Sequence, residues 1–100
     1  MAQESTGIKE RQNTELKEPN QYKVIIFNDD FTTMEFVVKL LENVFLKTHA
    51  NAEQLMLKVH NSGKAVVGIY DYDTAVSRVT IATQMARQNG YPLKLIYTPA

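Results

Sequence analysis

The apolar residues of this chain are concentrated after residue 20, and this limits what the chain can fold into. Residues 1–20 hold four of the 44 apolar residues, so residues 21–100 hold the other forty. The first segment carries charges of both signs and cannot bury enough apolar surface to offset the entropy of ordering it. We therefore expect a flexible tail over 1–20 and one small folded domain over 21–100.

Composition excludes several classes of protein. Eleven basic residues balance eleven acidic ones, which argues against a nucleic-acid module with its basic footprint. No apolar run approaches the roughly 20 residues of a membrane span, and the first ten residues lack the apolar core of a secretory signal. The chain has no cysteine, so it has no disulfide, thiolate nucleophile or cysteine-bound zinc. We expect a cytoplasmic protein that meets neither nucleic acid nor membrane.

The first structured segment is a strand followed by a helix. Residues 22–27 are rich in β-branched and aromatic side chains and stop at the turn cluster Asn28-Asp29-Asp30. The sequence from Thr32 to Glu35 then matches a capping box, with Thr32 as the N-cap. Apolar residues recur at helical spacing from there until the pattern fades near Lys47.

The remaining pattern predicts two more helices and two more strands. A second capping box opens at Asn51, and Gly63 supplies the left-handed position that ends that helix. Residues 64–70 read as a strand, Asp73 caps a third helix, and residues 93–98 form the last strand. The order β-α-α-β-α-β predicts an α+β fold, a two-layer sandwich with a three-stranded, mainly antiparallel sheet and three helices on one face.

Two polar groups could carry chemistry. Asn28, Asp29 and Asp30 lie between the first strand and a helix N-terminus, where such residues also serve simply as turn formers. His60 borders the apolar face of the second helix, a place where histidines are more often structural than functional. Together, and beside an apolar wall, they suit a ligand with a positive amino group attached to a bulky apolar side chain. That wall comprises Met34, Val37, Met56 and Val59.

Catalytic alternatives find less support. A metal-dependent hydrolase could use Asp29, Asp30, His60 and His49, but no ligand spacing favours it. Ser62 follows His60 too closely on a helix end to form a hydrolytic triad. No P-loop or glycine-rich dinucleotide turn is present, so we expect no enzyme and no cofactor.

Three runs resemble the ClpS family, the adaptors that deliver N-degron substrates to the Clp ATP-dependent protease. They are YKVIIFNDDFTTMEFV at 22–37, MLKVHNSGKA at 56–65 and GYPL at 90–93. The resemblance spans essentially all of 21–100, and it implies the fold read above. It also implies that Asn28, Asp29 and His60 bind the substrate's α-amino group with support from Asp30.

The resemblance implies further roles along the chain. Met34 would be the gatekeeper against β-branched residues, in a side-chain pocket formed by Thr32, Met34, Val37, Met56, Val59 and Leu93. The tail would engage the unfoldase, and Asp73 and Arg78 would contact its N-terminal domain, whether of the ClpA or the ClpC type. Substrates would begin with Leu, Phe, Tyr or Trp, and the adaptor would act as a monomer. The alternative is an interaction module of similar fold without N-degron binding, such as the C-terminal domain of the ribosomal stalk protein.

Overall fold

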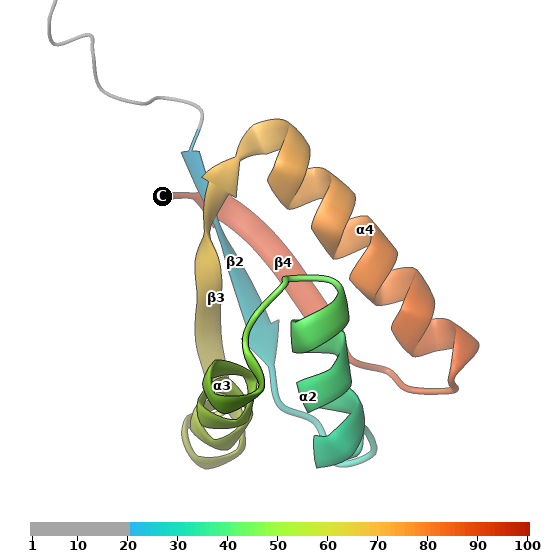
Figure 1. Ribbon diagram of the computed structural model, residues 1–100. Helices are drawn as coiled ribbons and strands as arrows, with labels where there is room; N and C mark the ends of the chain where they lie inside the picture. Colours follow the sequence, from blue (N-terminus) through green and yellow to red (C-terminus); the bar gives the residue numbers. More distant parts are fainter. Residues whose placement is uncertain (1–20) are drawn as a thin grey trace, which may run out of the picture.

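A computed structural model describes residues 21–100, and the tail expected over 1–20 lies outside the described residues. Three strands pair in the order β3-β2-β4, and both pairings are antiparallel. The predicted β-α-α-β-α-β order is therefore confirmed (Figure 1). The elements are β2 (Gln21–Phe27), α2 (Met34–Asn43), α3 (His49–Ser62), β3 (Lys64–Asp71), α4 (Tyr72–Gln88) and β4 (Lys94–Pro99).

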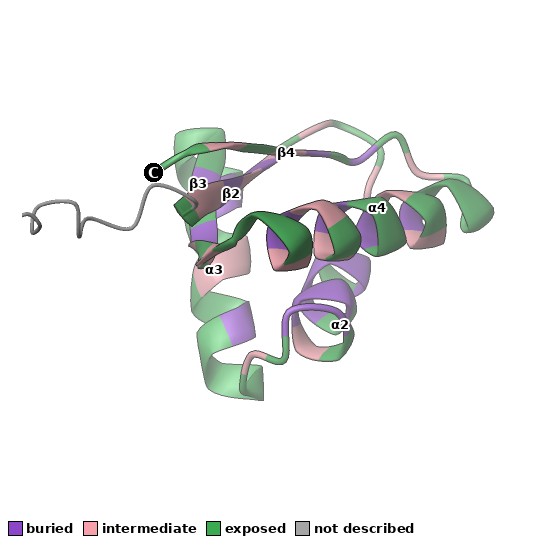
Figure 2. Ribbon diagram, turned by 90° about the horizontal axis from the view of Figure 1, so that it is seen from above, coloured by how far each residue is buried: buried purple, intermediate pink, exposed green. Residues whose placement is uncertain are grey.

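The core lies between the sheet and its helices. Val24 and Ile26 of β2 are fully buried, whereas the residues between and beside them are only partly covered, as strand alternation requires. Figure 2 shows α2 and α4 on one side of the sheet. Their buried residues belong to the same core cluster as Val24 and Ile26. Helix α3 packs against α2 and β3. Within residues 21–100, no helix is long and apolar enough to cross a membrane.

Helix α2 begins one residue later than predicted. The N-cap is Thr33 rather than Thr32, and the Thr33 hydroxyl accepts a hydrogen bond of 3.1 Å from the amide of Phe36. The hydroxyl of Thr32 instead lies at Asp29, to which it donates a hydrogen bond. The helix ends at Asn43, short of the predicted Lys47.

The predicted caps of the other two helices are also wrong. Helix α3 starts earlier, because the Thr48 hydroxyl, and not Asn51, accepts from a backbone amide at 3.2 Å. Helix α4 is capped by Asp71, whose carboxylate accepts from the Thr74 amide at 2.8 Å, so Asp73 lies inside the first turn. The left-handed Gly63 at the end of α3 is confirmed, with φ of 90°.

Candidate functional site

A hollow of about 400 Å³ opens where the end of β2 meets the beginning of α2 and the last turns of α3. Its volume lies within the range typical of small-ligand sites. The structure brings together there all the residues expected to bind an amino group and most of those expected to bind a side chain. The lining comprises Asn28, Asp29, Asp30, Phe31, Thr32, Thr33, Met34, Val37, Met56, Val59 and His60.

A backbone contact joins the two polar groups that lie far apart in the sequence. The amide of Asn28 donates a hydrogen bond of 2.9 Å to the carbonyl of Gly63. Gly63 adopts the left-handed conformation that ends α3, and its own amide bonds to the carbonyl of Val59. His60 lies in the last turn of α3, so this junction sets it beside the loop that follows β2.

Asp29 organises that loop. Its Oδ1 accepts hydrogen bonds from the amides of Phe31, at 2.8 Å, and Thr32, at 2.7 Å, while Oδ2 accepts from the Thr32 hydroxyl at 2.8 Å. Partial burial tends to raise the pKa of this carboxyl, but the bonds from Thr32 and Phe31, with the charge of Arg87, lower it overall. These bonds therefore favour the charged carboxylate of Asp29 over its protonated form.

The apolar side of the hollow combines fixed and adaptable parts. Val37 and Val59 are buried, so the core holds them in place. Met34, at the start of α2, is 44% exposed, and its flexible thioether forms part of the rim. The arrangement offers an apolar slot with a movable edge.

Two lining residues were absent from the prediction. Thr33 lines the hollow as well as capping α2, and Phe31 lies in the polar loop with 73% of its surface exposed. A lone aromatic side chain between turn residues was the signal that could have identified Phe31.

Leu93 does not line the hollow, contrary to the grouping expected from the resemblance. It is 1% exposed and belongs to the same buried cluster as Val37 and Val59. Its carbonyl accepts a hydrogen bond of 2.8 Å from Arg87. Leu93 therefore supports the wall of the site as a core residue.

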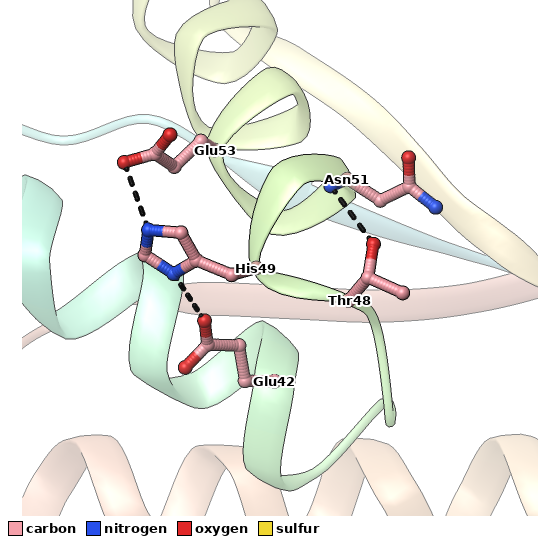
Figure 3. Close-up of polar contacts among 5 residues, drawn as sticks. All are labelled: Glu42, Thr48, His49, Asn51 and Glu53. Carbon is pink, nitrogen blue, oxygen red and sulfur yellow. Dashed lines mark hydrogen bonds and ion pairs between the residues drawn. The ribbon is translucent and has the colours of Figure 1, made fainter.

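His49 lies apart from the hollow. Its ring bridges two carboxylates, with Nδ1 at 2.5 Å from Glu42 of α2 and Nε2 at 3.2 Å from Glu53 of α3 (Figure 3). The hydrogen bond and charge of Glu42, with the charge of Glu53, raise the pKa of His49. In the part of the chain that the structure describes, no cluster of histidine and carboxylate side chains could hold a metal ion. The geometry thus gives no support to the metal-dependent alternative.

The two residues expected to contact an unfoldase lie along α4, outside the hollow. Asp73 is exposed and borders an open depression with Tyr22 and Tyr72. Arg78 is half-buried, and its guanidinium donates a hydrogen bond of 2.6 Å to the carbonyl of Val44 at the end of α2. Arg78 therefore also ties α4 to α2.

The fold and the hollow define a class: a small α+β domain with one open face of the sheet and a pocket that joins hydrogen-bond acceptors to an apolar slot. Residues 17–96 match the family model described as ATP-dependent Clp protease adaptor protein ClpS. The chain belongs to the ClpS family, a family of protease adaptors.

Individual relatives agree with this assignment. The chain is 47% identical to the ClpS adapter of Acetivibrio thermocellus over 96 residues, which cover 96% of this chain and 97% of the relative. It is also 47% identical to the ClpS adapter of Helicobacter hepaticus over 91 residues, covering 91% and 92%. Among solved structures it resembles Agrobacterium tumefaciens ClpS2 bound to L-phenylalaninamide, with a TM-score of 0.79 and 34% identity. That match covers 83% of this chain and all of ClpS2.

Proposed function

We propose that this adaptor binds proteins with a free N-terminal Leu, Phe, Tyr or Trp and delivers them to a Clp AAA+ unfoldase for degradation. One observation carries the proposal: Asn28, Asp29 and His60 share a single hollow with the apolar wall of Val37, Val59 and the two methionines. The α-amino group and the side chain of an N-terminal residue leave the same carbon atom. A site for both must hold acceptors and an apolar slot side by side.

The amino group finds suitable acceptors. Protonated, it offers three donors, which the side-chain oxygen of Asn28, a neutral ring nitrogen of His60 and the carboxylate of Asp29 can accept. A carboxylate has about four acceptor positions, and the loop uses three of those on Asp29. The fourth position and the full negative charge remain for the ligand, and Asp30 adds charge at the rim. In this role Asp29 both shapes the loop and attracts the ammonium group.

The side chain of the N-terminal residue enters the apolar slot. ClpS2 supports this proposal, because L-phenylalaninamide presents a free amino group and a benzyl side chain. Met34, Thr32 and Met56 line the hollow, and the resemblance to the family implies that a branch at Cβ would meet the Met34 side chain. We therefore propose that Met34 excludes Ile and Val. The chain does this work by binding alone, as a monomer without catalysis or cofactor, in the cytoplasm.

Delivery would use other parts of the chain. We propose that the tail over 1–20 is the segment an unfoldase engages, and that Asp73 and Arg78 on α4 contact the N-terminal domain of a ClpA-type or ClpC-type partner. A chain lacking residues 1–20 should then bind peptide as the full chain does but fail to accelerate degradation of an N-degron substrate. Normal acceleration by the truncated chain would overturn the role of the tail.

Peptides that differ only in their first residue test the proposed specificity. Fluorescence anisotropy with all twenty N-terminal residues should show binding to Leu, Phe, Tyr and Trp, and at least tenfold weaker binding to the charged and small residues. The alternative, an interaction module of the same fold without N-degron binding, predicts no dependence on the first residue. Equal affinities across the set would favour that alternative.

A further inference from the structure

The sheet has a second face, opposite to the helices. Val24 and Ile26 of β2 point into the core, and the buried residues of α2, α3 and α4 all belong to that one core cluster. Figure 2 shows α2 and α4 on the same side of the sheet. Successive strand residues point to opposite faces, so the residues between and beside Val24 and Ile26 point away from the core. Within residues 21–100 the three helices leave this outer face uncovered.

Strand pairing fixes which residues share the outer face. Residues that pair across antiparallel strands point to the same side of a sheet. The register of β2 with β3 and β4 therefore gives three rows of three residues, which we call the open sheet face. The rows are Lys64-Phe27-Lys94, Val66-Ile25-Ile96 and Ile69-Lys23-Thr98. A register shift beside Val24 sets Val66 and Ile69 on one side although they are three residues apart.

The centre of the open sheet face is apolar. Val66, Ile25 and Ile96 form an unbroken aliphatic row across all three strands, and Val66 is 44% exposed. Phe27 and Ile69, the latter 56% exposed, extend this row toward the two ends of the sheet. An antiparallel sheet that keeps one face in water normally carries polar side chains there. A continuous apolar patch in their place indicates a surface for contact with another molecule.

The charged residues of the open sheet face are all positive. Lys64 and Lys94 lie on the two outer strands beside Phe27, and Nζ of Lys94 is 5.2 Å from the centre of the Phe27 ring. Lys23 lies on the central strand, on the other side of the aliphatic row. None of the nine positions holds a carboxylate, although the whole chain carries as many acidic as basic residues. The face is therefore complementary to an acidic and apolar partner, whereas two copies of it would repel each other.

The dimensions of the open sheet face suit one helix. Neighbouring strands lie about 4.8 Å apart, so the outer strands are separated by roughly 10 Å, which is the diameter of an α-helix. Along β2 the outer rows are separated by about 13 Å, a distance that about nine residues of helix cover. A helix laid along the strands would add a third layer to the fold. Its apolar stripe would contact the aliphatic row, and acidic side chains on its flanks would reach the three lysines.

An anionic membrane would share the charge preference, but the side chains suit it less well. Segments that bind at a membrane surface bury projecting aromatic and leucine side chains among the lipids. On the open sheet face, Ile25, Ile96 and Phe27 are half-buried between their neighbours and cannot extend that far. A helix with its own side chains can reach them.

We propose that the open sheet face docks an acidic amphipathic helix of a partner protein. The hollow that would hold an N-terminal residue lies where the end of β2 meets α2 and α3. A helix on the outer face leaves that hollow accessible, so the adaptor could hold a substrate and this partner together. The inference goes beyond the proposed function and does not depend on it.

Two helical peptides of about 18 residues, or five turns, serve as probes. The acidic probe carries leucine on one face and glutamate elsewhere, and the basic probe has lysine in place of every glutamate. Both are N-acetylated, so neither presents a free N-terminus to the hollow. In NMR titrations of the full chain, the acidic probe should shift the amide signals of β2, β3 and β4. It should bind at least about tenfold more tightly than the basic probe, and this preference should weaken in 0.5 M salt.

Two matched pairs of variants locate the docking surface. Lys64→Glu reverses a charge on the open sheet face, and Lys39→Glu makes the same change at an exposed position of α2, on the other side of the sheet. We expect Lys64→Glu to weaken binding of the acidic probe by about three- to tenfold and Lys39→Glu by about twofold or less. Val66→Ser should weaken it by a similar factor, whereas Ile81→Ser, at a comparably exposed position of α4, should not.

Three results would overturn the proposal: equal affinity for the two probes, equal effects within either pair of variants, or signal changes confined to the helices. Competition between the acidic probe and L-phenylalaninamide would place the probe in the hollow and would also overturn it. Sedimentation of the chain with phosphatidylglycerol vesicles, without binding of the acidic probe, would assign the open sheet face to a lipid surface instead of a protein partner.

Discussion

The hydroxyl of Thr32 donates a hydrogen bond of 2.8 Å to Oδ2 of Asp29, while the Thr32 amide donates one of 2.7 Å to Oδ1 of the same carboxylate. One residue of this loop, through its backbone amide and its hydroxyl, thus holds the proposed amine-binding carboxylate in place at both of its oxygens. The neighbouring Thr33, and not Thr32, caps α2. Loop order and ligand binding depend on the same group.

Substitutions at this pair should separate the two roles of Asp29. Asp29→Ala removes both the charge and the loop bonds, so we expect a loss of peptide affinity of about tenfold to a hundredfold. Thr32→Val removes only the hydroxyl bond and should cost less, about two- to tenfold. Asp30→Asn is the control, because it removes one negative charge from the hollow without touching these bonds. Calorimetric titration with a Phe-initiated peptide measures all three, and an Asp29→Ala chain that binds normally would contradict the assignment.

The pKa of Asp29 also determines how binding depends on pH. A carboxyl whose pKa is lowered on folding contributes stability that is fully present above its unfolded value of about 3.9, and that is lost as pH falls through the lower folded pKa. Asp29 therefore stays charged between pH 8 and pH 5. Any loss of affinity in that interval has to come from another group.

His60 is expected to accept a hydrogen bond from the amino group of the ligand. An imidazole nitrogen that carries no hydrogen offers one acceptor. His60→Ala removes this acceptor, so we expect peptide affinity at pH 7 to fall by about tenfold, the loss of one charge-assisted hydrogen bond. A His60→Ala chain that binds a Phe-initiated peptide as the unmodified chain does would exclude His60 from the amine site.

Met34 should control which side chains enter the hollow. Met34→Ala removes the side chain at the rim, so we expect peptides that begin with Ile or Val to gain about tenfold or more in affinity. Met85→Ala is the matched control, because Met85 is half-buried on α4 and does not line the hollow. Affinities of both variants for peptides that begin with Phe, Ile or Val measure the effect. Unchanged rejection of Ile and Val by Met34→Ala would remove Met34 from the gatekeeper role.

The connection between α2 and α3 contains a strained residue. Leu46 has a φ of 57°, a left-handed conformation that costs a leucine about 1–2 kcal/mol, and it is 71% exposed. Asparagine adopts this conformation more readily, so Leu46→Asn should raise the free energy of unfolding by about 0.5–1 kcal/mol. Leu57→Asn, at an exposed helical position of α3, should lower it instead. Urea unfolding measures the stability of both variants. A Leu46→Asn chain less stable than the unmodified chain would contradict this account.

Sequence reasoning predicted the order of elements because each has a strong local signal, such as the β-branched run before Asn28 and the left-handed Gly63. It misplaced the helix starts where two neighbouring side chains could serve as the cap. Thr32 and Thr33 are chemically alike, and only the folded loop, in which Thr32 bonds to Asp29, places the hydroxyl of Thr33 at the amide of Phe36. Such choices depend on contacts that no local pattern contains.

The residues of the candidate site were predictable because local sequence patterns mark them. Their arrangement in space was not, because it depends on contacts between distant segments. Asn28 and His60 are separated by more than thirty residues, and a backbone bond between Asn28 and Gly63 brings their segments together. The sequence therefore identifies the polar cluster and the apolar wall as candidate binding groups, but it does not predict the backbone contact that brings them together. Leu93 was grouped with the pocket by resemblance, but it does not line the hollow, whereas the likewise buried Val37 and Val59 do. Which buried residues border the hollow depends on packing, which sequence spacing does not specify.

The most direct test of the proposed recognition compares one Phe-initiated peptide with its N-acetylated form. Acetylation removes the positive charge of the amino group and leaves the benzyl side chain and the rest of the peptide unchanged. If Asn28, Asp29 and His60 bind a free α-amino group, the acetylated peptide should bind at least about a hundredfold more weakly at pH 7. Equal affinity for the two peptides would show that the hollow recognises an apolar side chain alone, and would contradict the account of this protein as a reader of free N-termini.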